Sequence, residues 1–242
     1  MLLAQNGWNE ARTTHFIIYY KNAPDNFIEE LKGSAEDYYN TIADDLGFRR
    51  YNFWLWENRA KIYIYDDIGD FQRSTLQPTW AAGAAMTKDK VIHTFPNEQG
   101  FFDTILPHEL GHIIFREFVG FDNSAIPYWL DEGVASFQEN VRRKNVNRLL
   151  RDALSKGILM GIEQLSVVNP QSVSDQQLAN LYYAEALGVV NFLIQEYGSD
   201  TFVKFCQELR DRKDLAQALR VVYSFESIQQ LDEAWQKYLS HG

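Results

Sequence analysis

Apolar and polar positions follow one pattern in the first hundred residues and another in the rest. Short runs of β-branched and aromatic residues, each closed by turn residues, predict strands. One segment between them has apolar side chains three and four residues apart and predicts an amphipathic helix. The predicted elements are strands at 14–20 and 61–65, a helix at 25–46, and a hairpin at 80–95 with its turn at 87–90.

From residue 101 onward the apolar spacing is helical nearly to the end. Ser174 and Gly198 frame the longest helix as caps. We expect an α+β fold in which a small mixed sheet with an edge hairpin packs on the first of these helices. Residues 1–120 would form this α+β subdomain and residues 121–242 a mostly helical one. The predicted helices lie at 104–118, 128–142, 145–156, 175–197, 200–211 and 227–239.

The composition excludes several classes of function. The chain has 242 residues, 45% of them hydrophobic, which is enough to bury a real core. Acidic residues (33) outnumber basic ones (23), and the formal net charge of −10 leaves no basic face for nucleic acid. The single cysteine, Cys206, excludes a multi-cysteine metal cluster. Any metal must therefore be held by nitrogen and oxygen ligands.

The sequence predicts neither a leader nor a transmembrane segment. Its first residues turn polar at Gln5, and the longest uncharged apolar stretch, near residues 80–86, is far short of the roughly 20 residues that span a bilayer. The sequence does not determine the cellular compartment of the protein. It is extracytoplasmic if an export signal has been removed and cytoplasmic otherwise.

One motif carries chemistry: His108, Glu109 and His112 form the H-E-x-x-H sequence HELGH. Four residues advance a helix by slightly more than one turn, so both imidazoles project from one face and can share a cation. Glu109 lies about 100° around the helix, where it can take a proton from water activated by the metal. Apolar flanks predict a buried helix, in which two histidines need partners. We therefore predict one Zn²⁺ ion as cofactor.

Two other residues bear on this predicted helix. Pro107 lacks an amide proton, which is tolerated in a first turn, so we expect Thr104 to be the N-cap. Gly111 costs about 1 kcal/mol of helix propensity relative to alanine. It therefore indicates the close approach of another helix or of the substrate.

A catalytic zinc needs a third protein ligand, for which the sequence offers two candidates. The metzincin pattern is excluded, because the positions that would be Gly and His are Phe115 and Phe118. Glu132 lies twenty residues after the second histidine, which leaves room for a loop and a second helix to return its carboxylate to the metal. Glu185, on a later predicted helix, is the alternative.

HELGH, followed by WLDEG around Glu132, resembles the gluzincin metallopeptidases, and more closely the peptidase MA-like domains of bacteria. Those zincin-like domains begin with a strand, a helix, a strand and an edge hairpin, and the similarity covers most of residues 13–240. The resemblance implies that His108, His112 and Glu132 are the zinc ligands and that Glu109 is the general base.

The resemblance also implies contacts with substrate. In the family the edge strand pairs with an extended peptide, and Gly83, Ala84 and Ala85 are our candidates for that surface. A tyrosine on a later helix stabilises the oxyanion in the family. Tyr183 is the first candidate for this role, and its neighbour Tyr182 is the second.

Three positions around these motifs bear on substrate and metal. The aminopeptidase branch carries G-x-M-E-N on the edge strand, whose acid binds a free amino terminus, whereas GAAMTKD here has no acid in that place. This favours an endopeptidase. Some gluzincins orient a zinc-bound histidine with an acid four residues after the third ligand, where this chain has the weaker acceptor Ser136. Asp131 adjoins the third candidate ligand and is expected to point away from it.

The remaining candidates have structural interpretations. His93 either lines the cleft or lies on the surface, and His15 and His241 are interpreted as structural. The basic run at 142–144 is expected to form a solvated helix face.

These features together predict a zinc-dependent metallopeptidase that acts on peptide or protein substrates in a cleft between the two subdomains. One alternative is a catalytically weak or inactive zinc-binding module that binds peptides or proteins. Another is a structural metal site, which a fourth protein ligand would close to water.

Overall fold

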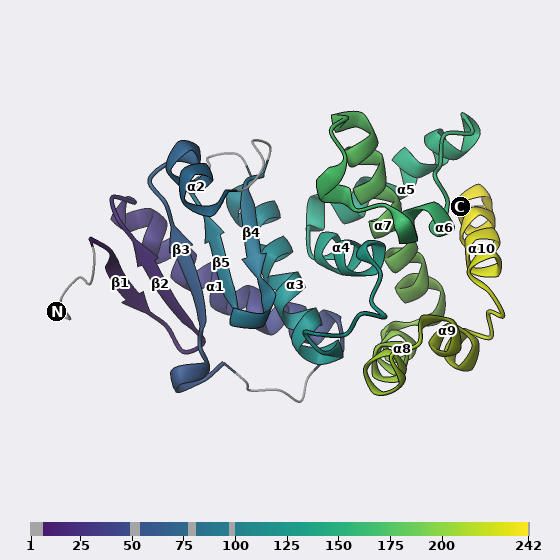
Figure 1. The fold of residues 1–242 in the computed structure, drawn as a ribbon, viewed down its shortest axis with the longest axis horizontal. Coiled ribbons are helices and arrows are strands. Elements are labelled where there is room, and N and C mark those ends of the chain that lie inside the picture. Colours follow the sequence, from purple (N-terminus) through teal and green to yellow (C-terminus); the bar gives the residue numbers. More distant parts are fainter. Residues whose placement is uncertain (1–6, 49–53, 77–80, 97–99, 242) are drawn as a thin grey trace.

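The computed structural model describes residues 7–48, 54–76, 81–96 and 100–241. Figure 1 shows the sheet and the helices packed on it in one half of the molecule and a group of helices in the other half. The predicted α+β class with a mostly helical C-terminal half is confirmed. Trp80, at the start of the predicted hairpin, and the first six residues lie outside the described residues.

A mixed sheet forms the N-terminal part, with described strands in the order β1-β2-β3-β5-β4. β2, β3 and β5 pair in parallel, and β1 and β4 add to the two edges in antiparallel. A short turn at residues 87–89 joins β4 to β5 as a hairpin, so β4 is an edge strand. The strands are β1 (Asn9–Arg12), β2 (Phe16–Tyr20), β3 (Ala60–Ile64), β4 (Gly83–Met86) and β5 (Val91–Thr94).

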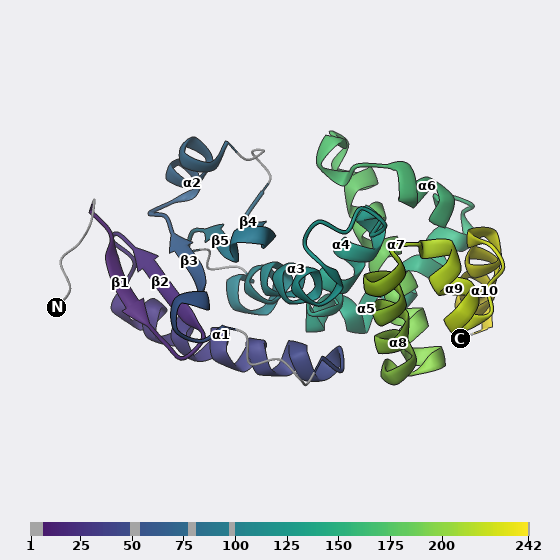
Figure 2. The ribbon, with the colours of Figure 1, turned by 60° about the horizontal axis from the view of Figure 1, so that its bottom comes forward.

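One face of this sheet supplies the core. Phe16 and Ile18 of β2 and Ile62 and Ile64 of β3 are fully buried at alternate positions, as a half-buried strand requires. Figure 2 shows that α1 (Asp25–Asp45) and α3 (Leu106–Val119) lie on one side of the sheet and α2 (Ile68–Thr75) on the other. α3 also packs against α4, so it joins the two parts of the molecule.

The C-terminal part is built around α7, which is buried without interruption from Ala184 to Ile194. A helix that is apolar on all sides belongs in the middle of a helical group, and α7 packs against α4, α5, α8 and α10. The helices are α4 (Tyr128–Phe137), α5 (Asn140–Ser155), α6 (Ile162–Val167), α7 (Gln176–Tyr197), α8 (Ser199–Arg212), α9 (Leu215–Tyr223) and α10 (Ile228–His241).

The structure differs from the sequence prediction in three ways. The predicted helix at 128–142 is two helices, because α4 ends and α5 begins within it. β1, α2, α6 and α9 were not predicted, since each is too short to display a clear period. Asp175 rather than Ser174 caps α7, because its carboxylate accepts hydrogen bonds from the amides of Gln177 and Leu178.

The contact between α4 and α7 is close enough to exclude a side chain. A Cβ atom at Gly133 would lie 2.4 Å from the carbonyl oxygen of Ala186 and 2.7 Å from Cγ2 of Val190. We predict that Gly133→Ala lowers the free energy of unfolding by about 1–3 kcal/mol through overpacking. Urea denaturation measures this change.

Gly33 of α1 is the matched control, because a Cβ there would meet nothing within 4 Å. Gly33→Ala should leave stability unchanged or raise it by up to about 1 kcal/mol through helix propensity. Equal effects of the two substitutions would show that the α4–α7 contact is not tight.

Candidate active site

A π-helical turn, Phe101–Ile105, leads directly into α3. Pro107 lies in the first turn of α3, where proline is tolerated. Thr104 is not the N-cap that the sequence predicted: its amide already donates to the carbonyl of Gly100 at 2.8 Å, within the π-helical turn. Such turns are frequent at functional sites, and this one ends three residues before the first histidine.

The two histidines of HELGH project from α3 toward each other. Their Nε2 atoms are 3.2 Å apart. Nδ1 of His108 lies 2.9 Å from Oε1 of Glu139, and Nδ1 of His112 lies 2.9 Å from Oδ1 of Asp131. A carboxylate accepts hydrogen bonds, so each Nδ1 carries a proton and, in the neutral ring, each Nε2 lone pair faces the shared space.

α4 returns the third candidate ligand to these histidines. A Cβ atom at Gly111 would lie 2.9 Å from Cα of Ala135 and 3.1 Å from Cγ of Gln138. The sequence indicated that either another helix or the substrate comes close to Gly111, and in the structure the neighbouring helix α4 does so. Glu132 lies one turn before Ala135 on α4, and its carboxylate reaches both imidazoles.

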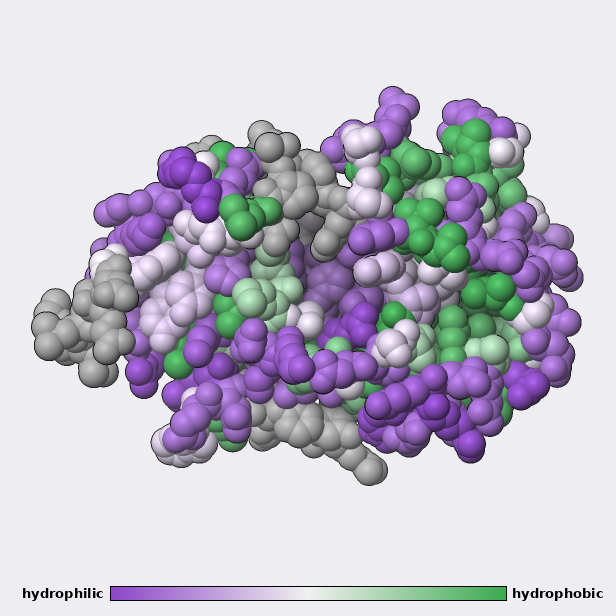
Figure 3. Space-filling view, in the orientation of Figure 1, coloured by the Kyte–Doolittle hydropathy of each residue, from purple (hydrophilic) through white to green (hydrophobic). Residues whose placement is uncertain are grey.

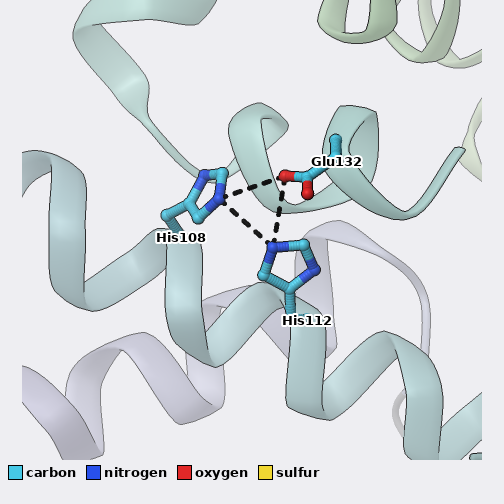
Figure 4. A group of neighbouring side chains, drawn as sticks. All are labelled: His108, His112 and Glu132. Atoms are coloured by element: carbon cyan, nitrogen blue, oxygen red, sulfur yellow. Dashed lines mark hydrogen bonds and ion pairs between the residues drawn. The ribbon is translucent and has the colours of Figure 1, made fainter. Parts of the chain in front are cut away.

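Figure 4 shows the resulting cluster of His108, His112 and Glu132. Oε2 of Glu132 is 3.5 Å from Nε2 of His108 and 3.4 Å from Nε2 of His112. This oxygen is buried and makes no hydrogen bond within the described residues. Three ligands of a tetrahedral zinc at about 2.0–2.1 Å from the ion are about 3.3–3.4 Å apart. The cluster therefore fits a zinc ion.

The charges of the cluster favour a bound cation. Burial opposes a charged imidazole, but Glu132 and Glu139 outweigh it and raise the pKa of His108 to about 9. Burial likewise opposes ionisation of Glu132, yet the two histidines lower the pKa of that carboxyl well below its usual range. The surroundings thus stabilise positive charge beside an ionised carboxylate, whether protons or a metal supply it.

Asp131 contacts the opposite side of the His112 ring from Glu132, so it also takes part in the site, a role that the sequence did not predict. Besides accepting from His112, its carboxylate accepts from Nε of Arg116 at 2.6 Å. Asp131 precedes Glu132 in the first turn of α4, where α3 is close enough for both carboxylates to reach it. Ser136, the expected histidine partner, has a buried hydroxyl without a hydrogen bond in the described structure.

Glu139 fills the role that Ser136 was expected to fill. It lies between α4 and α5, its side chain is 2% exposed, and it bridges His108 and Arg142. NH1 of Arg142 donates to Oε1 of Glu139 at 2.9 Å. Arg142 is exposed, in agreement with the predicted solvated helix face, and it also lines the cleft.

Glu109 is buried against the edge strand. A Cβ atom at Gly83 would lie 2.7 Å from Oε1 of Glu109 and 3.1 Å from its Cδ. Burial raises the pKa of Glu109, and the charges of His108 and His112 oppose that rise. Gly83 therefore lets β4 and this carboxylate approach each other without a clash.

The two candidate tyrosines lie in different surroundings. The ring of Tyr183 lines the cleft, with its centroid 6.4 Å from that of His108. Tyr182 is fully buried, and its hydroxyl donates to the carbonyl of Leu165 at 3.3 Å. Burial raises the pKa of Tyr183, and Glu132 and Glu109 add to that effect. Its phenol is a hydrogen-bond donor at neutral pH.

A cleft of about 880 Å³ joins these groups. In Figure 3 the surface is hollowed between the two parts of the molecule, and the visible floor is hydrophilic. Gly83, Ala84 and Ala85 of the edge strand line one side, and α3, α4, α5, α7 and the loop at 121–127 contribute much of the rest.

The other candidate residues lie away from this cluster. Both oxygens of Glu185 accept from backbone amides, those of Met160 and Gly161, so this carboxylate holds a loop and not the site. His93 is half-buried and contacts the hydroxyl of Tyr65 at 3.0 Å. His15 pairs with Glu36. His241 is exposed at the end of α10.

The fold and the cluster define a peptidase-like α+β protein. The sequence model of the Peptidase MA superfamily matches residues 55–241, and the chain belongs to that superfamily. The resemblance inferred from HELGH and WLDEG is thereby confirmed. Members of the superfamily typically bind zinc. No curated protein matches the chain.

A membrane-spanning helix is not among the elements described above. Within the described residues, none of the helices combines the length and apolar character that crossing a bilayer requires.

The carboxylate behind His108 gives a testable prediction. Glu139→Gln removes the charge that orients and polarises the imidazole, so zinc affinity should fall about 10- to 100-fold. Competition with a chromophoric chelator measures the dissociation constant. Ser136→Ala is the control, because this hydroxyl contacts neither histidine, and its zinc affinity should match that of the unmodified protein. A larger loss of zinc affinity in Ser136→Ala than in Glu139→Gln would contradict the assignment of Glu139 as the carboxylate that orients His108.

Proposed function

We propose that the protein is a zinc-dependent metallopeptidase that hydrolyses peptide bonds. The observation that carries the proposal is the triangle of Nε2 of His108, Nε2 of His112 and Oε2 of Glu132, with sides of 3.2–3.5 Å. A buried carboxylate, Glu109, and an edge strand lie beside this triangle. Zinc held by these three residues would supply Lewis-acid chemistry, polarising a carbonyl and activating water.

Glu109 has the properties of a general base. Its burial against Gly83 raises the pKa, which brings the carboxyl closer to the working range for proton transfer near neutral pH. A carboxylate in this position takes a proton from the attacking water and then gives it to the departing amine. β4 lies against this carboxylate and forms one wall of the cleft in which both transfers would occur.

Tyr183 is suited to stabilise developing negative charge on the former carbonyl oxygen. Its ring faces the cleft near His108, and its raised pKa keeps the hydroxyl protonated. A fixed donor directed at an oxyanion is worth about 10²- to 10³-fold in rate. Tyr182 is less suited, because its hydroxyl is already bonded to a backbone carbonyl.

The edge strand provides a surface for the substrate backbone. Among the described strands Gly83–Met86 pairs with β5 alone, and three of its residues line the cleft. An extended peptide can add to such an edge through main-chain hydrogen bonds. Main-chain pairing does not require a free end of the peptide. Together with the absence of an acid in GAAM, this favours an endopeptidase over an aminopeptidase.

The role of Glu109 is tested by Glu109→Gln in the zinc-loaded protein. The amide keeps the shape of the side chain but cannot accept a proton, so turnover should fall by roughly 10²- to 10⁴-fold while one zinc per chain remains bound. Cleavage of a diverse peptide library, followed by mass spectrometry, measures the activity. Metal analysis measures the zinc content.

Glu208→Gln is the matched control, since Glu208 pairs with Arg212 on α8, away from the cleft, and should retain full turnover. Full activity of the Glu109→Gln protein would overturn the base assignment. Stoichiometric zinc without cleavage by the unmodified protein would instead favour the inactive peptide-binding module.

A further inference from the structure

Most charged side chains that line the cleft outside the zinc cluster already have partners. Asp122 pairs with Lys88 at 3.1 Å. Arg116 donates to Asp131 at 2.6 Å and to the carbonyl of Asn123 at 3.1 Å. Asp122 is an anion and does not attract a carboxylate, and the side chain of Arg116 is only 15% exposed, which limits its access to a ligand. Arg142 is different.

Arg142 has several unassigned donors in the cleft. Its guanidinium carries five N–H groups, and within the described part of the chain its one hydrogen-bond partner is Glu139, reached through NH1. The side chain is 40% exposed, and it lines the cleft. It also lies near the phenol of Tyr183, whose raised pKa it partly offsets. A guanidinium can bind a second carboxylate while keeping the first.

The start of α5 adds to the positive potential at this place. Arg142 is the third residue of this 16-residue helix. First-turn amides have no intrahelical acceptor, and the helix dipole favours anions there. The first turn of the described α5 has no acidic residue, and the carboxylate of its N-cap residue, Glu139, is shared between His108 and Arg142.

The orientation of β4 determines which part of a substrate reaches Arg142. β4 begins at Gly83, beside Glu109 near the start of α3, and the turn after it brings Lys88 to Asp122, beyond the end of α3. A peptide that pairs with β4 in antiparallel runs the opposite way. Its residues after the cleaved bond therefore lie toward the start of α3.

That end of the cleft is where Arg142 lies. Glu139 bridges His108, in the first turn of α3, and the guanidinium of Arg142. Thr104 and Ile105, just before α3, also line the cleft. A carboxylate on the carboxyl side of the cleaved bond would thus meet a guanidinium with free donors.

We propose that Arg142 is a specificity-determining residue that selects substrates with a carboxylate just after the cleaved bond. The proposal rests on the proposed peptidase function. The carboxylate is either an Asp or Glu side chain in the first two positions after that bond or a free C-terminus. Charge-assisted bonds to a guanidinium should favour such substrates about 10-fold or more in kcat/KM.

The test uses one peptide library in two forms, with free and with amidated C-termini. Three zinc-loaded proteins cleave each form: the unmodified protein, the Arg142→Gln variant and the Arg143→Gln variant. Arg143 is the matched control, since it pairs with Asp45 and Asn140 and does not line the cleft. The readout is the ratio of carboxylate-bearing to neutral substrates cleaved. Arg142→Gln also removes a partner of Glu139 and can weaken zinc binding. Such a loss of zinc lowers the cleavage rates of carboxylate-bearing and neutral substrates alike and leaves their ratio unchanged.

We expect at least about 10-fold enrichment of carboxylates after the cleaved bond with the unmodified protein and Arg143→Gln, and its loss with Arg142→Gln. Enrichment that persists after amidation identifies acidic side chains as the source, and enrichment that amidation abolishes identifies the free C-terminus. The proposal would be overturned if the unmodified protein cleaved neutral and carboxylate-bearing peptides equally well. It would also be overturned if the enrichment of carboxylates survived the Arg142→Gln substitution.

A binding measurement separates this proposal from the proposed function. Zinc-loaded Glu109→Gln protein, alone and combined with Arg142→Gln, is titrated with two amidated hexaalanine peptides that carry Glu or Gln at position five, and with the free-acid form of hexaalanine. Tighter binding of a carboxylate-bearing peptide that depends on Arg142 supports the specificity role even if no peptide is cleaved. Equal binding of all three peptides overturns it.

Discussion

The close approach of α4 to both α3 and α7 is the constraint on which the site depends. Gly111 brings the backbone of α4 against α3, and Gly133 brings α4 against α7. Glu132 lies beside Gly133, so these contacts set the position of its backbone. Protein interiors are packed too densely to absorb a shift of even one methyl group without cost. The backbone positions from which the three candidate ligands reach one point are thus set by helix packing.

A second layer of charge fixes the chemical state of that cluster. Asp131 and Glu139 each hold one imidazole by Nδ1, which directs the Nε2 atoms to the same point. Arg116 and Arg142 in turn balance these carboxylates. Such partners are needed because an unpaired buried charge is costly. The cost also explains why the cluster is fit for a cation: the carboxylate of Glu132 has no other hydrogen-bond partner in the described structure.

The helical spacing in HELGH was enough to predict that His108 and His112 face one point, and the position of Glu132 followed from the room for a loop and a returning helix. The sequence pattern did not predict that the carboxylates of Asp131 and Glu139 hold the two histidines. Asp131 was excluded by a rule for neighbours on one helix, which ignores the second helix close beside it. Glu139 was missed because its role depends on the break between α4 and α5. A local sequence pattern does not reveal where two helices meet.

The central claim is that His108, His112 and Glu132 bind zinc in a site open to substrate. The most direct test is a crystal structure of the zinc-loaded protein with anomalous data collected on both sides of the zinc edge. The account predicts one zinc peak at about 2.0–2.2 Å from Nε2 of each histidine and from a Glu132 oxygen, without a fourth protein ligand. A zinc peak elsewhere, or a fourth side chain that closes the coordination sphere, would contradict it.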